Sequence, residues 1–124
     1  MKIIVADKEH RDRSQLVGLL KLYFLKVSNQ RNSVVLEAGT ADEAVRLIGD
    51  NPDAFAIIVQ DEIDQKMKGI DLIRQARRQS AGAKLFLSSS SYLSASVEKY
   101  AVDLGCHVIQ KPYSMSTLEK LHVT

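Results

Sequence analysis

Short apolar runs alternate with longer amphipathic segments along the whole chain. The runs are rich in β-branched residues and predict strands, whereas apolar residues spaced by three and four positions predict a helix after each run. This alternation is typical of repeated βα units that build a parallel sheet. The predicted strands cover residues 3–6, 34–38, 55–59, 85–87 and 107–109.

Capping signals mark where several of the predicted helices begin or end. Thr40 and Glu43 have the spacing of a capping box at the start of the second helix. Gly105 is placed to end the fourth helix, and Ser114 to cap the last one. The helix side chains expected to face the core are Leu16, Leu19, Leu20, Tyr23, Phe24, Val27, Ala41, Ala44, Val45, Ile48, Ile70, Leu72, Ile73, Ala76, Val97, Ala101, Leu104, Met115, Leu118 and Leu121.

The predicted strands are apolar throughout, which implies that helices cover both faces of the sheet. Right-handed crossovers leave few topologies, and the flavodoxin-like strand order 2-1-3-4-5 is the commonest for five units. We therefore predict a single α/β domain over residues 1–124, a three-layer (βα)5 sandwich with that order. In this order the strands that precede Asp7 and Asp61 are neighbours.

Length and composition limit the class of protein. A chain of 124 residues with 45% hydrophobic content fits one domain with a real core. Its 17 basic and 15 acidic residues are too balanced to favour nucleic acid or a membrane surface. There is neither a signal peptide nor a long apolar run, so we expect a cytoplasmic protein. The single cysteine, Cys106, excludes an internal disulfide and is expected to be a small buried residue.

Polar side chains follow three of the predicted strands. Asp7 ends the first strand, Asp61 lies just past the third, and Lys111 follows the fifth. The carboxyl ends of parallel strands meet at one edge of the sheet, where open α/β folds place their chemistry. Two carboxylates and an ammonium at this edge predict a site that binds a cation and handles an anionic group.

Four motifs in register resemble the receiver domain of two-component response regulators, the CheY-like family, over residues 2–121. One such motif alone would be a weak signal, but four in the same order are specific. They are Val5-Ala6-Asp7-Lys8, Val59-Gln60-Asp61 with Met67 and Gly69 downstream, Leu87-Ser88-Ser89-Ser90, and Gln110-Lys111-Pro112-Tyr113.

The resemblance implies that Asp61 accepts a phosphoryl group from a histidine kinase or a phosphotransfer protein. Lys111 would pair with one phosphoryl oxygen as a compact point charge. A serine hydroxyl would donate to another oxygen. Ser88 is preferred because it directly follows the apolar run, whereas counting back from Lys111 points to Ser89.

The resemblance also implies Mg²⁺ held by Asp7, Asp61 and Ile63, and a cis peptide at Lys111-Pro112. Phosphorylation would shift a two-state equilibrium in the face made by the fourth helix, the fifth strand and the last helix. That face would contact an effector domain or a second copy in a homodimer. We thus expect a phosphorelay signalling phosphoprotein and not an enzyme, without direct nucleic-acid or membrane contacts.

Three positions depart from the family pattern. Lys8 replaces the second acidic residue, which should weaken or abolish Mg²⁺ binding, and Lys8 could itself pair with Asp61. Val108 replaces the switch aromatic, so the usual coupling of hydroxyl and aromatic cannot operate. Gln65 replaces a proline in the loop after Asp61.

These departures favour an alternative, a pseudo-receiver that binds protein partners independently of phosphate. A flavin-binding protein of this fold is disfavoured, because residues 8–12 contain no glycine for a phosphate-cradling loop. The sequence leaves open the cognate kinase, the output and the oligomeric state.

Two surface features carry weaker expectations. Arg74, Arg77 and Arg78 lie on the outer side of the third predicted helix, where a solvated basic face is expected. Tyr100 and Tyr113 fall near the face that the family uses for partners, although single exposed aromatics are ordinary.

Overall fold

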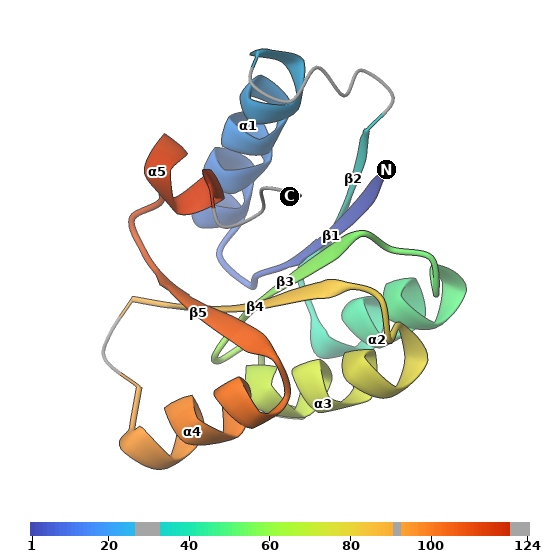
Figure 1. The fold of residues 1–124 in the computed structure, drawn as a ribbon, viewed down its shortest axis with the longest axis vertical. Helices are drawn as coiled ribbons and strands as arrows, with labels where there is room; N and C mark the ends of the chain where they lie inside the picture. The colour runs from blue at the N-terminus through green and yellow to red at the C-terminus, as the bar shows by residue number, and fades with distance from the viewer. Residues whose placement is uncertain (27–32, 91–92, 120–124) are drawn as a thin grey trace.

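Five parallel strands form one sheet with helices on both faces in the computed structural model, which describes residues 1–26, 33–90 and 93–119 (Figure 1). The strand order is β2-β1-β3-β4-β5, so the predicted α/β sandwich and its flavodoxin-like order are confirmed. The elements are β1 (Lys2–Ala6), α1 (His10–Lys26), β2 (Val34–Ala38), α2 (Ala41–Asp50), β3 (Ala56–Gln60), α3 (Gly69–Gln79), β4 (Lys84–Ser89), α4 (Ala95–Asp103), β5 (Cys106–Gln110) and α5 (Met115–Leu118).

Helices α2, α3 and α4 cover one face of the sheet (Figure 1). Successive residues of a strand point to opposite faces, so alternate positions of the strands enter this layer. The strands contribute Ile4, Ala6, Ile57, Val59, Leu85 and Leu87, and the helices contribute Ala41, Ala44, Ile48, Leu72, Ile73, Ala76 and Ala101. The predicted inward positions Val45, Ile70, Val97 and Leu104 are partly buried against this cluster.

Helices α1 and α5 cover the opposite face (Figure 1). The other set of alternate strand positions meets α1 here, in a cluster that includes Ile3, Val5, Ile58, Phe86, Leu16, Leu20, Tyr23 and Phe24. Leu118 is buried as predicted, but Met115 is 38% exposed and its predicted inward position is wrong. The single turn of α5 directs only Leu118 onto this layer. Val27 and Leu121 lie outside the described residues.

The predicted caps at Thr40 and Gly105 form, with one difference at Thr40. Thr40 Oγ1 accepts a hydrogen bond from Glu43 N at 3.2 Å, as in a capping box. The Glu43 carboxylate, however, accepts from Gly39 N at 3.5 Å rather than from the amide of Thr40. Gly105 has φ of 71°, so it ends α4 in the left-handed conformation that glycine adopts without steric cost.

Arg77 differs from the solvated residue that the sequence predicts. Its Nε donates to Leu104 O at 2.9 Å, and its Nη1 donates to Ala81 O at 2.9 Å and to Ala83 O at 3.3 Å. Its Nη2 also donates to Gly105 O at 3.4 Å. A single guanidinium, with its fixed fork of donors, therefore joins the turn before β4 to the turn before β5.

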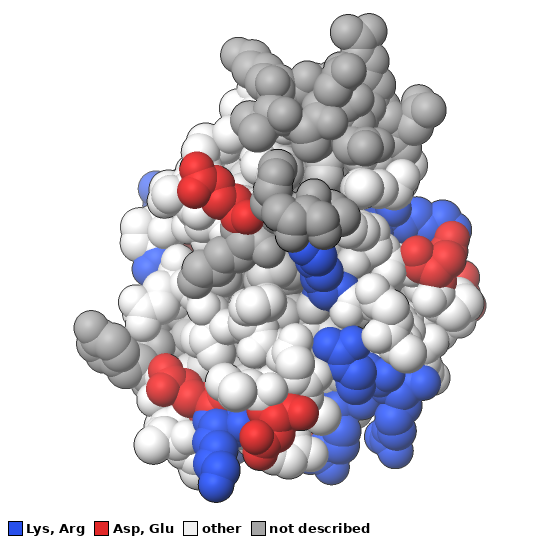
Figure 2. Space-filling model, viewed as in Figure 1, with Lys and Arg blue, Asp and Glu red and all other residues white. Residues whose placement is uncertain are grey.

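The remaining charges of this region face solvent. Arg74 and Arg78 are exposed, as expected. Basic side chains gather at the lower right of Figure 2, where Figure 1 has the C-terminal half of α3, whereas acidic and basic side chains are mixed over α4. Within the described ranges no helix is long and apolar enough to cross a membrane.

Cys106 begins β5 and is buried in the layer of α2, α3 and α4, which confirms its expected place in the core. Burial raises the pKa of the Cys106 thiol to about 12. The thiolate is the reactive form of cysteine, so we expect little reactivity from this side chain at neutral pH.

Replacing Gly69 by alanine should destabilise the fold. A Cβ there would overlap the carbonyl oxygen of Gln60 and come within 2.9 Å of Asp61 Cα, so the backbone itself would have to move. We expect Gly69→Ala to lower the free energy of unfolding by about 1–3 kcal/mol in urea titrations.

Gly49→Ala is the matched control, because a Cβ on this helical glycine would meet no atom within 4 Å. Alanine should raise the free energy of unfolding there by up to about 1 kcal/mol. Equal effects at the two positions would contradict the close approach at Gly69.

Candidate functional site

Four strands deliver polar side chains to one edge of the sheet. Asp7 follows β1, Asp61 follows β3, Ser89 ends β4 and Lys111 follows β5. These four strands are adjacent and parallel, so their carboxyl ends lie side by side. A cavity of about 270 Å³ opens at this edge, lined by Lys8, Glu9, Asp12, Gln60, Asp61, Glu62, Ser90 and Lys111.

The ammonium of Lys111 lies between two carboxylates. Lys111 Nζ is 2.8 Å from Asp7 Oδ2 and 2.8 Å from Asp12 Oδ2. The side chains of Lys111 and Asp7 are only 8% and 2% exposed, whereas that of Asp12 is 36% exposed. We call these three residues the Lys111 clamp.

Burial disfavours the charged form of Lys111, but the hydrogen bonds to Asp12 and Asp7 outweigh this effect and raise the pKa of Lys111 above its ordinary value. A backbone hydrogen bond also holds Lys111 at the end of β5, since Lys111 N donates to Ser89 O at 2.8 Å. Asp7 Oδ1 accepts from Glu9 N at 2.8 Å, so both oxygens of the Asp7 carboxylate are engaged.

Asp61 lies next to the Lys111 clamp, half-buried at the end of the central strand. Its Oδ2 accepts a hydrogen bond from Ser89 Oγ at 3.1 Å. Its backbone is held on both sides, because Asp61 N donates to Ser88 O and Asp61 O accepts from Gly69 N, each at 2.8 Å. The carboxylate is therefore firmly placed at the mouth of the cavity.

The preference for Ser88 as the hydroxyl beside Asp61 is wrong, and the alternative position, Ser89, is the one that contacts the carboxylate. Ser88 is buried on the opposite face of β4, where its Oγ is 2.7 Å from the hydroxyl of Tyr113. Neighbouring strand residues point to opposite faces, so one position in sequence decides which serine reaches the site.

Tyr113 is also buried, at 6% exposure, and not part of an exposed partner face. Burial raises the pKa of Tyr113, while the hydrogen bond from Ser88 acts in the opposite direction. The cis peptide expected at Lys111-Pro112 is present.

No family model and no curated protein matches the sequence. Solved structures do match the fold. A response regulator from Burkholderia pseudomallei, crystallised with a phosphorylated aspartic acid, calcium and citrate, has a TM-score of 0.74 and 23% identity over 98% of this chain and 66% of its own. The Vibrio cholerae chemotaxis protein CheY4 has a TM-score of 0.73 and 17% identity, covering 96% and 92% of the two chains.

The receiver domain of a DNA-binding response regulator from Colwellia psychrerythraea has a TM-score of 0.80 and 15% identity, covering 97% of this chain and 93% of its own. This chain has the fold of CheY-like response-regulator receiver domains. Identities of 15–23% establish the fold, and the chemistry of the site has to be argued from its own residues.

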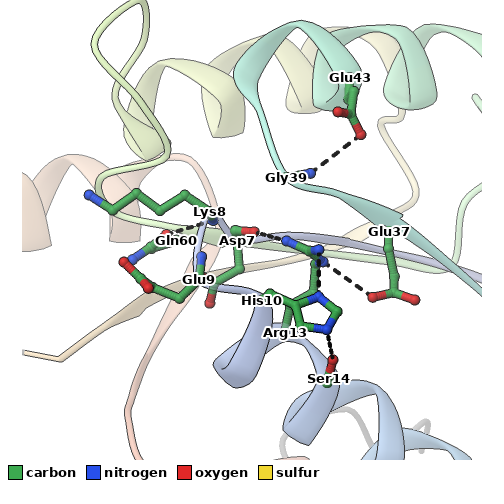
Figure 3. Close-up of polar contacts among 10 residues, drawn as sticks. All are labelled: Asp7, Lys8, Glu9, His10, Arg13, Ser14, Glu37, Gly39, Glu43 and Gln60. Atoms are coloured by element: carbon green, nitrogen blue, oxygen red, sulfur yellow. Dashed lines mark hydrogen bonds and ion pairs between the residues drawn. The ribbon is translucent and has the colours of Figure 1, made fainter.

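Lys8, the main departure from the receiver pattern, points away from Asp7. Its backbone N donates to Oε1 of the buried Gln60 at 3.0 Å, and its side chain extends away from the Asp7 carboxylate (Figure 3). Within the described part of the chain, Lys8 makes no ion pair, so the pairing with Asp61 that the sequence allows does not form.

Arg13 ties the loop after β1 to the neighbouring strand. Its Nη1 donates to Asp7 O at 2.6 Å, and its Nε donates to Glu37 Oε1 at 3.2 Å (Figure 3). His10 Nδ1 lies 3.2 Å from Arg13 Nη2. These contacts fix the position of Asp7 relative to the first turn of α1.

The loop after Asp61 is anchored as well. Ile63 is fully buried, and Asp64 Oδ2 accepts from Ala41 N at 2.7 Å, which caps the start of α2 from another part of the chain. This amide lowers the pKa of the Asp64 carboxyl. Gln65, which replaces the family's proline, is exposed.

The residues at this edge do not fit the expected Mg²⁺ site of Asp7, Asp61 and Ile63. Only two of the three expected ligands, Asp7 and Asp61, are carboxylates, and no third His, Cys, Asp or Glu side chain among the described residues completes a metal-binding group with them. The ammonium of Lys111 already lies against Asp7 Oδ2, and Lys8 stands where the family has its second acid. Mg²⁺ requires near-octahedral oxygen ligands, and the ammonium of Lys111 against Asp7 Oδ2 repels a cation there.

Sequence reasoning missed Asp12, Gln60 and the pairing of Ser88 with Tyr113. Asp12 gives a partial signal in the sequence, because it is an acidic residue in the first turn of the helix that follows Asp7. Nothing local in the sequence indicates its contact with Lys111, which is 99 residues away.

Removing the ammonium of Lys111 should destabilise the domain strongly. Lys111→Met would leave Asp7 buried without a counter-charge, and breaking such a pair costs about 3–5 kcal/mol. We expect this loss in the free energy of unfolding measured by urea titration. Lys66→Met is the control, since Lys66 is paired with Asp42 at the same 2.8 Å but both side chains are more than 70% exposed. It should leave stability nearly unchanged, and equal losses would contradict the burial of the clamp.

Ser88 and Tyr113 should show energetic coupling. Ser88→Ala and Tyr113→Phe each remove one partner of a buried 2.7 Å hydrogen bond, which should cost about 1–2 kcal/mol. The double variant should lose less than the sum of the two single losses. Strict additivity in this cycle, measured by urea unfolding, would show that the two hydroxyls do not interact.

Proposed function

We propose that the chain is a receiver-type signalling domain in which Asp61 accepts a phosphoryl group from a phosphohistidine donor. The observation that carries the proposal is the position of the Asp61 carboxylate, which faces the cavity at the end of the central strand and accepts a hydrogen bond from Ser89. An aspartate nucleophile needs such an accessible position with a polar donor beside it.

Phosphoryl transfer to Asp61 requires the other residues to position the reacting groups, and none of them has to form a covalent bond. A carboxylate oxygen of Asp61 would attack phosphorus, so that an O–P bond forms while the N–P bond of the donor breaks and the imidazole leaves with its electron pair. The Ser89 hydroxyl already touches this carboxylate and can donate to a phosphoryl oxygen. Lys111 lines the same cavity and can offset the added negative charge.

Fold comparison supports the same proposal by analogy. The Burkholderia pseudomallei response regulator of this fold holds a phosphorylated aspartic acid. By the same analogy we propose a histidine kinase or phosphotransfer protein as the donor, cytoplasmic location, and an effector domain or second copy as the partner of the α4-β5-α5 face. The domain would act as a switch and not as an enzyme. No Mg²⁺ step belongs to the proposal, because the residues do not fit that ion.

A second candidate function is a phosphate-independent interaction domain of the same fold. The Lys111 clamp favours it, since the cation at this edge is already neutralised by two carboxylates. Val108, partly buried in β5, also removes the aromatic through which receiver domains transmit the state of the site.

Beryllofluoride, which mimics an aspartyl phosphate, distinguishes the two functions. If the first is correct, titration with and without Mg²⁺ should give saturable amide NMR shifts at Asp61, Ser89 and Lys111, and Asp61→Asn should abolish them. Asp53→Asn, at the opposite end of the sheet in an exposed pair with Lys2, should leave the shifts intact. No response of the unmodified chain under either condition would overturn the first function and favour the second.

A further inference from the structure

Asp12 is the unexpected member of the Lys111 clamp. It comes from the first turn of α1, and its carboxylate lies as close to Lys111 Nζ as that of Asp7 does, at 2.8 Å. Lys111 Nζ donates a hydrogen bond to Asp12 Oδ2 and forms an ion pair with Asp7 Oδ2. Lys111 is thus engaged with β1 and α1, and no ion pair joins it to Asp61 among the described residues.

Moving Lys111 toward Asp61 would be costly. Asp7 is 2% exposed, so losing its counter-charge would leave a buried carboxylate unpaired. The side chain of Asp12 is more accessible, at 36% exposure. Asp12 acts both on the ammonium of Lys111 and on the charge of the cavity. It adds attraction that holds the ammonium in place, and it adds negative charge to the wall of the cavity.

The other charged residues that line the cavity also disfavour the binding of an anion. Its lining includes four acidic residues, Glu9, Asp12, Asp61 and Glu62, and two lysines, Lys8 and Lys111. An anion that enters this space must compete with Asp12 for Lys111 and is repelled by Asp12 at the same time.

We propose that Asp12 is a positioning residue which, with Asp7, holds Lys111 away from Asp61 and so lowers the affinity of the cavity for a phosphoryl-like anion. The effect on affinity rests on the proposed function of Asp61, whereas the positioning of Lys111 does not. Transfer of Lys111 from Asp12 to an anion on Asp61 would also release the contact between α1 and the loop after β5.

The first test is beryllofluoride affinity, measured by amide NMR titration of the full chain. Asp12→Asn keeps the shape of the side chain but removes its charge, and it should bind beryllofluoride about tenfold more tightly than the unmodified chain. Asp12→Glu restores the carboxylate and should return the affinity toward the original value. Unchanged affinity in Asp12→Asn would overturn the proposal, and weaker affinity would show that Asp12 helps to bind the anion or an accompanying cation.

Asp42→Asn is the matched control. Asp42 is also an acidic residue in the first turn of a helix and also lies 2.8 Å from a lysine ammonium, that of Lys66, but it does not line the cavity. It should leave the affinity unchanged, which separates the effect of the clamp from a general effect of helix-terminal charge.

The second test reads Lys111 directly and needs no anion. In ¹⁵N NMR the side-chain ammonium signal of Lys111 should be protected from hydrogen exchange in the unmodified chain and less protected in Asp12→Asn, with recovery in Asp12→Glu. An unaltered signal in Asp12→Asn would overturn the clamp itself. If beryllofluoride binds to no variant, the proposed function of Asp61 fails, and the ammonium signal alone then decides whether Asp12 positions Lys111.

Discussion

A lysine with a nearly buried side chain at the carboxyl edge of the sheet constrains the residues around it. The side chain of Lys111 is 8% exposed, and a charge in such a place is tolerated only with anionic partners in good geometry. Asp7 and Asp12 provide them and thereby fix the loop after β1 and the first turn of α1 against the loop after β5. The geometry of this edge therefore depends first on the ion cluster of Lys111, Asp7 and Asp12.

Asp61 has a different environment from the clamp, although both lie at the same edge. It is half-buried, it is held through its backbone by Ser88 and Gly69, and its side chain contacts a neutral hydroxyl. Positive charge is therefore close to Asp61 but committed elsewhere. The same structure is therefore compatible with both proposed functions, a phosphoacceptor and an interaction domain. Which of them applies depends on whether Lys111 can leave Asp12 for an anion on Asp61.

Much of the fold could be predicted from the sequence, because strand and helix periods are local properties. The strands, their order and the adjacency of the two strands that precede Asp7 and Asp61 follow from alternating βα units. The choice between Ser88 and Ser89 failed because β4 extends two residues beyond the apolar run, and each added residue reverses the face.

Long-range side-chain contacts escaped prediction for another reason. Asp12 and Arg77 both read as surface charges on helices, and only the three-dimensional structure shows what their charged groups reach. Met115 shows the opposite error, since an apolar residue in a one-turn helix has little core to face. Periodicity indicates which side of an element is apolar, and says little about partners brought together by the chain's topology.

The burial of Cys106 has a practical consequence for experiments on this domain. With its thiol buried and its pKa raised to about 12, the native cysteine should remain silent toward thiol reagents while the domain is folded. A reporter cysteine introduced on an exposed position of α1 or α4 could then carry a spin label or fluorophore without removal of the natural residue. Labels on α1 or α4 of the otherwise unmodified chain could then follow how these helices move when a ligand is added at the carboxyl edge of the sheet.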